Sequence, residues 1–179
     1  MALCEKILLA GFSGAGKTSF LRELESSAPE KWILFDDLDQ LILKQHGKQD
    51  SDLASMIERE GWEKFRLWER QLLDGWLKEE GRGVLALGGG TLHPNLIQIL
   101  SPIKKIRILH LQCDFETCWS RLRGETEVRP LVLRGKQEFK KIFESRAEIF
   151  QMIPWRMDNS ASTDLSLLAQ KFWKEVSPS

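Results

Sequence analysis

The 179-residue chain has no excess charge of either sign: Lys and Arg together count 26, as do Asp and Glu. A chain without net positive charge is a poor candidate for sequence-independent nucleic-acid binding, because that binding depends on neutralising phosphates. The chain also has only 3 Cys, with no even-numbered framework for disulfides. The few cysteines indicate a reducing compartment, so we expect a cytoplasmic protein. The balanced charge leads us to expect no nucleic-acid partner.

Neither of two apolar segments has the form of a targeting or membrane signal. Residues 7–12 are apolar, but no positively charged region precedes them and Gly-Lys-Thr follows, so a signal peptide is not expected. Residues 83–103 contain no Asp, Glu, Lys or Arg and are long enough to span a bilayer. Their four Gly and two Pro favour a buried strand, a glycine loop and a short helix instead.

The chain shows no internal repeat, low-complexity tract or Pro/Gly/Ser linker, which indicates a single domain over residues 1–179. Short apolar runs predict buried strands, and longer segments with apolar residues every three or four positions predict helices. Their alternation predicts an α/β fold with a parallel sheet, whose ligands bind beyond the carboxyl ends of the strands. The predicted strands are residues 6–10, 32–35, 84–87, 106–111 and 155–158, and the predicted helices are 18–26, 62–78, 115–122, 136–152 and 164–176.

Residues 11–18 read Gly-Phe-Ser-Gly-Ala-Gly-Lys-Thr, the complete GxxxxGK[ST] pattern between a predicted strand and a predicted helix. The glycines let backbone amides converge on phosphate oxygens, and the helix N-terminus favours anions. Lys17 is placed to reach the β and γ phosphates, and the Thr18 hydroxyl to ligate Mg²⁺. A dinucleotide fingerprint would need glycine at position 19, which is serine. We predict a nucleoside triphosphate site formed by Gly14, Ala15, Gly16, Lys17, Thr18 and Ser19.

Other absences narrow the class of phosphate-loop protein. A signalling GTPase needs Asn-Lys-x-Asp, but the only asparagines, Asn95 and Asn159, are followed by Leu and Ser. A transport ATPase needs a Walker-B Asp at a strand end, where residues 88–90 are three glycines. A small-molecule kinase is the class that remains.

Candidate acceptor groups follow the other strands. Asp36, Asp37 and Asp39 come after the second predicted strand, where clustered carboxylates are costly unless a metal or an acceptor hydroxyl meets them. The alternative is a solvated helix start, where Asp is favoured by the helix dipole. Three glycines at 88–90 allow a substrate close to backbone amides, although an ordinary turn is the alternative.

Two further groups of residues have competing interpretations. The aromatic residues of helix 62–78 are interpreted as core residues. Arg66 lies beside them within i,i+3 reach of Glu69. It is either a ligand-binding group or one member of a surface ion pair with Glu69. Cys113 and Cys118 with His110 resemble a metal site but have no fourth ligand, so buried thiols are favoured.

Taken in order, these motifs resemble those of the shikimate kinase family over about residues 5–165. The resemblance is carried by residues 11–18, Asp37-Leu-Asp39, Gly61-x-x-x-Phe65-Arg66-x-x-Glu69, Gly88-Gly89-Gly90, Arg129-Pro130-Leu131 and Arg146. It implies a five-stranded parallel sheet of order 2-3-1-4-5 with helices on both faces, as in nucleoside monophosphate kinases. The implied reaction, in aromatic amino-acid biosynthesis, transfers the ATP γ-phosphoryl group to the 3-hydroxyl of shikimate with Mg²⁺, giving shikimate 3-phosphate and ADP.

The same resemblance implies roles for individual residues. Lys17, Asp39 and Arg129 would be catalytic, with Asp39 at the acceptor hydroxyl and Arg129 moving toward the phosphate on a lid at about 123–136. Mobile substrate-binding helices are implied at about 38–66. The implied shikimate contacts are Asp39, Arg66, Gly88, Gly89, Gly90 and Arg146; the implied Mg²⁺ contacts are Thr18 and Asp37; and the implied adenine contacts are the 121–123 region and Ser162.

Several positions depart from the family pattern. Leu43 stands where an acidic residue is usual, Phe150 where Tyr is frequent, and Glu127 where a neutral lid residue is common. Two alternatives therefore remain beside a shikimate kinase that works as a monomer on ATP and shikimate. One is a nucleotide-binding protein that has lost transfer activity, and the other is a kinase of a different small polyol acid.

Overall fold

Five strands form one parallel sheet at the centre of the computed structural model, which describes residues 6–47, 50, 52–124, 135–160 and 163–176. The strands are β1 (Lys6–Ala10), β2 (Trp32–Asp37), β3 (Arg82–Ala86), β4 (Ile106–Gln112) and β5 (Trp155–Asp158). Their order across the sheet is β2-β3-β1-β4-β5, with every neighbouring pair parallel. The predicted fold class and strand order are confirmed.

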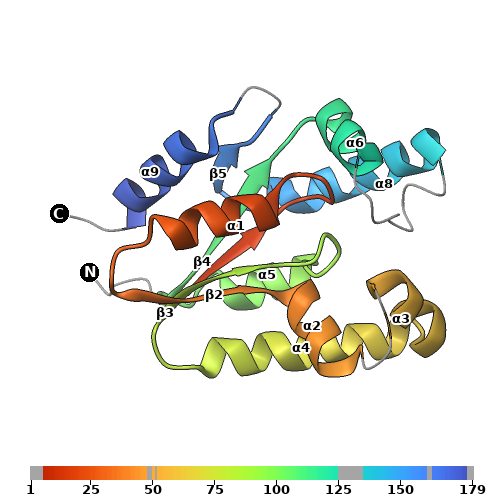
Figure 1. The fold of residues 1–179 in the computed structure, drawn as a ribbon, viewed down its shortest axis with the longest axis horizontal. Helices are drawn as coiled ribbons and strands as arrows, with labels where there is room; N and C mark the ends of the chain where they lie inside the picture. Colours follow the sequence, from red (N-terminus) through yellow and green to blue (C-terminus); the bar gives the residue numbers. More distant parts are fainter. Residues whose placement is uncertain (1–5, 48–49, 51, 125–134, 161–162, 177–179) are drawn as a thin grey trace.

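Helices cover both faces of this sheet (Figure 1). One face carries α1 (Lys17–Ser26) and α9 (Leu165–Val176), which lie side by side. The other face carries α4 (Trp62–Lys78), α5 (Pro94–Leu100), α6 (Phe115–Gly124) and α8 (Gly135–Gln151). Two short helices, α2 (Leu38–His46) and α3 (Leu53–Glu60), pack against α4 and occupy most of the region expected to hold the acceptor.

The central strand β1 shows why the chain forms three layers. All five of its residues are buried, and successive side chains of a strand point to opposite faces. Ile7 and Leu9 join the core beneath α1 and α9, whereas Leu8 and Ala10 join the larger core on the other face. Burial on both faces explains the continuous apolar run, which alternation alone would not predict.

Four strand boundaries differ from the sequence-based prediction: the end of β2, both ends of β3 and the end of β4. The difference in β2 removes a candidate site residue. Strand β2 continues to Asp37, so Asp36 and Asp37 are consecutive strand residues with side chains on opposite faces. Asp36 accepts a hydrogen bond of 2.7 Å from the indole nitrogen of Trp76. The interpretation of Asp36 as a candidate acceptor group is therefore wrong. Strand β3 ends at Ala86, which leaves Leu87 between the strand and the glycines.

The uncharged segment 83–103 forms most of β3, a glycine turn and α5, in agreement with its interpretation from the sequence. Among the helices of the described residues, none is long and apolar enough to cross a membrane.

An aromatic cluster on the α6 and α8 side connects the phosphate loop to the helices that flank residues 125–134. Phe12 of the loop packs edge-on against Phe139 and Phe143 of α8, with ring centroids 5.1 and 5.0 Å apart. Phe115 and Trp119 of α6 complete the cluster against Phe139. The loop and the first half of α8 are therefore joined by close ring packing.

His110 of β4 is held in its neutral form. Its ring stacks on Phe150 of α8 at 4.6 Å, and its Nδ1 is buried with no hydrogen-bond partner among the described residues. Burial, reinforced by the positive charges of Arg156 and Lys17, lowers the pKa of His110 to about 4.

This depressed pKa predicts a loss of stability in mild acid. The unfolded chain binds a proton near pH 6.5 and the folded chain only near pH 4, so the free energy of unfolding falls as pH decreases between these values. The expected loss is about 1–2 kcal/mol, because solvent screens a partly exposed ring. Urea unfolding at pH 7 and pH 4.5 measures it, and His110→Phe is expected to reduce the difference. His93→Asn, at an exposed helix cap, is the control; an unaltered pH difference in His110→Phe would contradict the assignment.

Candidate active site

The phosphate loop links β1 to α1 and holds two glycines in the left-handed region. Gly14 has φ 82° and Gly16 has φ 87°, and α1 begins at the next residue, Lys17. A residue with a side chain rarely adopts such angles, which accounts for glycine at both positions. The Lys17 ammonium group donates to the carbonyls of Gly11 and Phe12 at 2.9 and 3.2 Å, so it lies across the loop that would enclose phosphates.

Thr18 and Asp37 lie together, as the predicted magnesium site requires. The Thr18 hydroxyl donates to Asp37 Oδ2 at 2.7 Å, while Asp37 Oδ1 caps α2 by accepting from the amides of Asp39 and Gln40. A hydroxyl and a carboxylate oxygen beside a phosphate loop fit Mg²⁺, which is usually held by one or two carboxylates, phosphate oxygens and waters.

Asp39 follows this cap and faces the glycine turn after β3. A Cβ atom added at Gly88 would lie 2.8 Å from Asp39 Oδ1 and 3.1 Å from Glu69 Oε1. The lack of a side chain at Gly88 therefore lets two carboxylates from different helices approach the same point of the turn. The prediction that Asp39 and the glycines share one site agrees with this geometry.

Two guanidinium groups meet at the next glycine of the turn. A Cβ atom at Gly90 would lie 2.8 Å from Arg66 Nη2 and 3.2 Å from Arg146 Nη2, although Arg66 belongs to α4 and Arg146 to α8. Burial, followed by repulsion from Arg66, lowers the pKa of Arg146, and only Glu69 acts in the opposite direction. Two cations at one point favour an anionic ligand there.

Glu69 has a larger part in the site than its sequence position indicated. Its side chain is buried, accepts a 2.7 Å hydrogen bond from the Thr91 hydroxyl and forms an ion pair with Arg66. A buried carboxylate with these two partners orients the Arg66 guanidinium toward Gly90. The available signal was its i+4 spacing from Phe65, which places an acidic residue on the apolar face of the helix.

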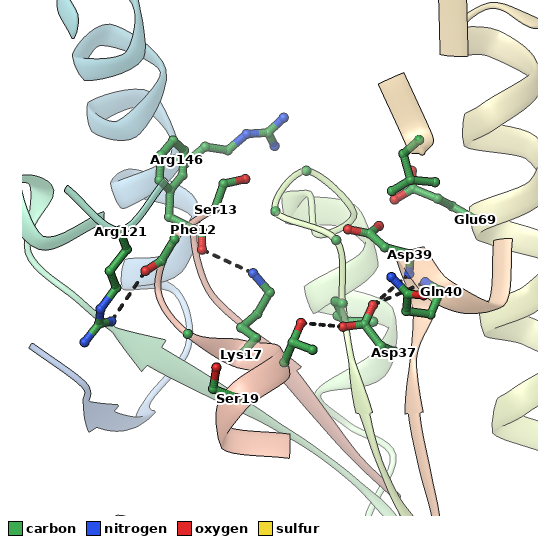
Figure 2. Close-up of a pocket in the computed structure, with 18 of the residues that line it drawn as sticks. Phe12, Ser13, Lys17, Ser19, Asp37, Asp39, Gln40, Glu69, Arg121 and Arg146 are labelled. Atoms are coloured by element: carbon green, nitrogen blue, oxygen red, sulfur yellow. Dashed lines mark hydrogen bonds between the residues drawn. The ribbon is translucent and has the colours of Figure 1, made fainter. Parts of the chain in front are cut away.

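A single cavity of about 1480 Å³ joins the phosphate loop to the acceptor residues. In Figure 2, Lys17 lies at its centre with Arg121 on one side and Asp37, Asp39 and Glu69 on the other. The interpretation of Trp62 as a core residue is wrong: it is half exposed, lines the cavity and lies beneath the Arg66 guanidinium at 5.1 Å. Leu43 lines the same cavity.

Two residues, one from α6 and one directly after β5, hold the main chain of the phosphate loop. Arg121 lies within the region predicted to contact adenine, and its Nη1 donates to the carbonyls of Gly14 and Ala15, each at 3.4 Å. Asn159 is buried and donates from Nδ2 to the Ala15 carbonyl at 2.8 Å, a contact that no sequence motif indicated. The predicted site residues Arg129 and Ser162 lie outside the described residues.

Comparison with known proteins gives consistent matches. The family model described as shikimate kinase matches residues 13–177. The shikimate kinase of Streptococcus gordonii is 35% identical over 150 residues, which cover 83% of this chain and 85% of that protein. A bifunctional shikimate kinase/3-dehydroquinate synthase of Thermotoga maritima is 30% identical over 96% of this chain, which spans 34% of that larger protein.

Solved structures agree with these relatives. A shikimate kinase from Acinetobacter baumannii in complex with shikimate superposes with a TM-score of 0.77 and 25% identity, covering 97% of this chain and 93% of that one. The Aquifex aeolicus enzyme, at a TM-score of 0.74, 21% identity and 93% coverage of both chains, shares the fold. With a family model matched over nearly its whole length and a relative at 35% identity, the chain belongs to the shikimate kinase family.

Proposed function

We propose that this chain transfers the γ-phosphoryl group of ATP to the 3-hydroxyl of shikimate, forming shikimate 3-phosphate and ADP in the route to chorismate and the aromatic amino acids. One observation carries the proposal. The Thr18–Asp37 hydrogen bond places the phosphate loop beside Asp39, in the cavity where Arg66 and Arg146 converge. An anionic acceptor with a hydroxyl group several ångströms from its carboxylate matches this distribution of charges.

On the nucleotide side, the chain supplies position and positive charge. The amides of residues 14–19 would bind the phosphates, and Lys17 would leave the loop carbonyls to contact the β and γ phosphates. Thr18 and Asp37 would hold Mg²⁺, which neutralises charge that develops on the transferring group. These contributions suffice for phosphoryl transfer, because its loose transition state is stabilised mainly by alignment of the reactants and by positive charge.

On the acceptor side, Arg66 and Arg146 would bind the shikimate carboxylate, each as a planar, charged donor. The amides of Gly88, Gly89 and Gly90 would line the same pocket. The anion would offset the burial and the repulsion from Arg66 that lower the pKa of Arg146. Asp39, from the other side of the glycine turn, would orient the 3-hydroxyl group and accept its proton.

The remaining assignments are proposals that rest on the family pattern. Arg129 would reach the transferring phosphate from a lid at about 123–136, Ser162 would contact adenine, and helices within 38–66 would move as the acceptor binds. We further propose that the single domain of residues 1–179 works as a cytoplasmic monomer; the free thiols of Cys113 and Cys118 suit a reducing compartment.

The test is ADP release from MgATP by the purified chain, measured with shikimate, quinate, gluconate or no acceptor. We expect release to depend on shikimate and to equal the shikimate 3-phosphate formed. Equal release with quinate or gluconate would favour another polyol acid. ATP binding without product from any acceptor would favour a binding protein that has lost transfer activity.

Asp39→Asn is expected to lower kcat about 10²- to 10⁴-fold, because an amide neither accepts the hydroxyl proton nor carries its charge. The shikimate KM is expected to change far less. Asp36→Asn is the matched control, since Asp36 is a nearby carboxylate at the end of β2 that bonds to Trp76 and does not line the cavity. Steady-state kinetics of both variants decide the point: if Asp39→Asn retains the parental kcat, Asp39 has no part in the chemistry.

Glu69→Gln is expected to raise the shikimate KM about five- to tenfold with a smaller change in kcat. An amide can still accept from Thr91, but Arg66 loses its charged partner and its fixed orientation. Stability should fall by about 1–3 kcal/mol, because a buried charged hydrogen bond is lost. Glu63→Gln, exposed on the same helix, is the control. A KM equal to that of the control would show that Glu69 does not position Arg66.

A further inference from the structure

Two cysteines lie behind the phosphate loop, away from the cavity where transfer would occur. Cys113 directly follows β4, and Cys118 lies in the first turns of α6, whose start is capped by Asp114. Both carry free thiols, and within the described part of the chain no group of His, Cys, Asp and Glu could hold a metal ion. Cys118 is buried as predicted, whereas Cys113 is only partly buried.

The two cysteines are neighbours at the start of α6 and are chemically unequal. With Asp114 as the cap, Cys113 stands just before it and Cys118 four residues after it, two positions whose side chains pack against each other at a helix start. Arg121 donates a hydrogen bond to the Cys113 sulfur at 3.5 Å. The hydrogen bond from Cys118, assisted by the charge of Arg121, lowers the pKa of the Cys113 thiol despite its partial burial. The pKa of Cys118 is raised by its hydrogen bond to Cys113 and by burial. This is the arrangement of one nucleophilic sulfur and one protonated neighbour.

A small side cavity leads to the reactive sulfur. It has a volume of about 160 Å³ and is lined by Cys113 together with Phe12, His110, Gln112 and Arg156. A water molecule occupies roughly 30 Å³ in the liquid, so a molecule the size of hydrogen peroxide fits while a peptide-sized disulfide does not. The cavity therefore gives a molecule the size of hydrogen peroxide access to Cys113.

We propose that Cys113 and Cys118 form a reversible thiol–disulfide pair that hydrogen peroxide oxidises, and that the disulfide weakens nucleotide binding through Arg121. The Cys113 thiolate attacks a peroxide oxygen, the O–O bond breaks, and the departing hydroxide takes a proton and leaves as water. The resulting sulfenic acid is attacked by the Cys118 sulfur, which releases its proton as the S–O bond breaks and a second water leaves. Two thiols lose two electrons and two protons, and one peroxide is reduced to two waters.

The consequence for the nucleotide follows from what these residues touch. The Arg121 group that donates to the Cys113 sulfur also donates to the carbonyls of Gly14 and Ala15. The main chain of Cys118 lies against the same loop, because a Cβ added at Gly14 would come within 2.5 Å of the Cys118 carbonyl oxygen. A disulfide brings the sulfurs to about 2.05 Å, and its sulfurs carry no negative charge. Arg121 then loses an acceptor, and the segment behind Gly14 shifts.

The test uses the full chain with Cys4→Ser, so that only this pair of the 3 cysteines remains. After hydrogen peroxide treatment we expect a mass loss of 2 Da, disappearance of both titratable thiols, and a peptide joining Cys113 to Cys118. The ADP dissociation constant, measured by calorimetry, should rise about three- to tenfold, corresponding to one or two lost hydrogen bonds. Dithiothreitol should reverse every change.

Cys118→Ala is the matched variant, because it keeps the nucleophilic sulfur and removes its partner. It should stop at a sulfenic acid that dimedone labels, with no mass loss of 2 Da. Cys113→Ser should show neither reaction, and serves if Cys118→Ala folds poorly. Two titratable thiols remaining after treatment, a disulfide between chains, or an intramolecular disulfide with an unaltered ADP dissociation constant would each overturn the proposal. Because ADP binding needs no acceptor, these outcomes are independent of whether the chain phosphorylates shikimate.

Discussion

The Asp37 carboxylate is the interaction on which the arrangement of the site depends. One oxygen caps α2 and so determines where the acceptor-side helices begin, while the other accepts the Thr18 hydroxyl of the phosphate loop. Since β2 and β1 are separated by β3 in the sheet, no backbone ladder joins these two segments directly. The side chain of Asp37 makes that connection across the carboxyl edge. The phosphate loop and the start of α2 are thereby held in a fixed position relative to each other.

The glycine turn after β3 provides space in which charged side chains can approach the backbone. At Gly88 it accommodates Asp39 and Glu69, and at Gly90 it accommodates Arg66 and Arg146. Negative side chains thus lie at Gly88 and positive side chains at Gly90, and together they come from three helices. Between them, Gly89 faces the phosphate loop, since a Cβ added there would lie 2.8 Å from the Ser13 hydroxyl oxygen. An anionic acceptor bound at this turn would be oriented by its own charge.

The sequence predicted the architecture well, because strands buried on both faces and a complete phosphate-loop pattern leave few alternatives. The site was less fully predictable. Thr18, Asp37, Asp39, Arg66 and Arg146 do meet in one cavity region, as the family resemblance implied. Asp36 was assigned wrongly because β2 extends two residues beyond its apolar run. Trp62 was assigned wrongly because helical spacing does not show which residue of an apolar helix face borders a cavity. Asn159 and Thr91 act through contacts far apart in sequence, which no local pattern encodes.

The aromatic packing of Phe12 on α8 places the two arginines in separately anchored groups of helices. Arg146 belongs to the helix that is joined by ring contacts to the phosphate loop, whereas Arg66 belongs to the helix packed with α2 and α3. An anion bound by both arginines would link α8 to α4 and its neighbouring helices. The acceptor would then help to close the cavity around itself. A neutral molecule of the same shape would bind neither arginine strongly and would leave the two groups of helices unlinked.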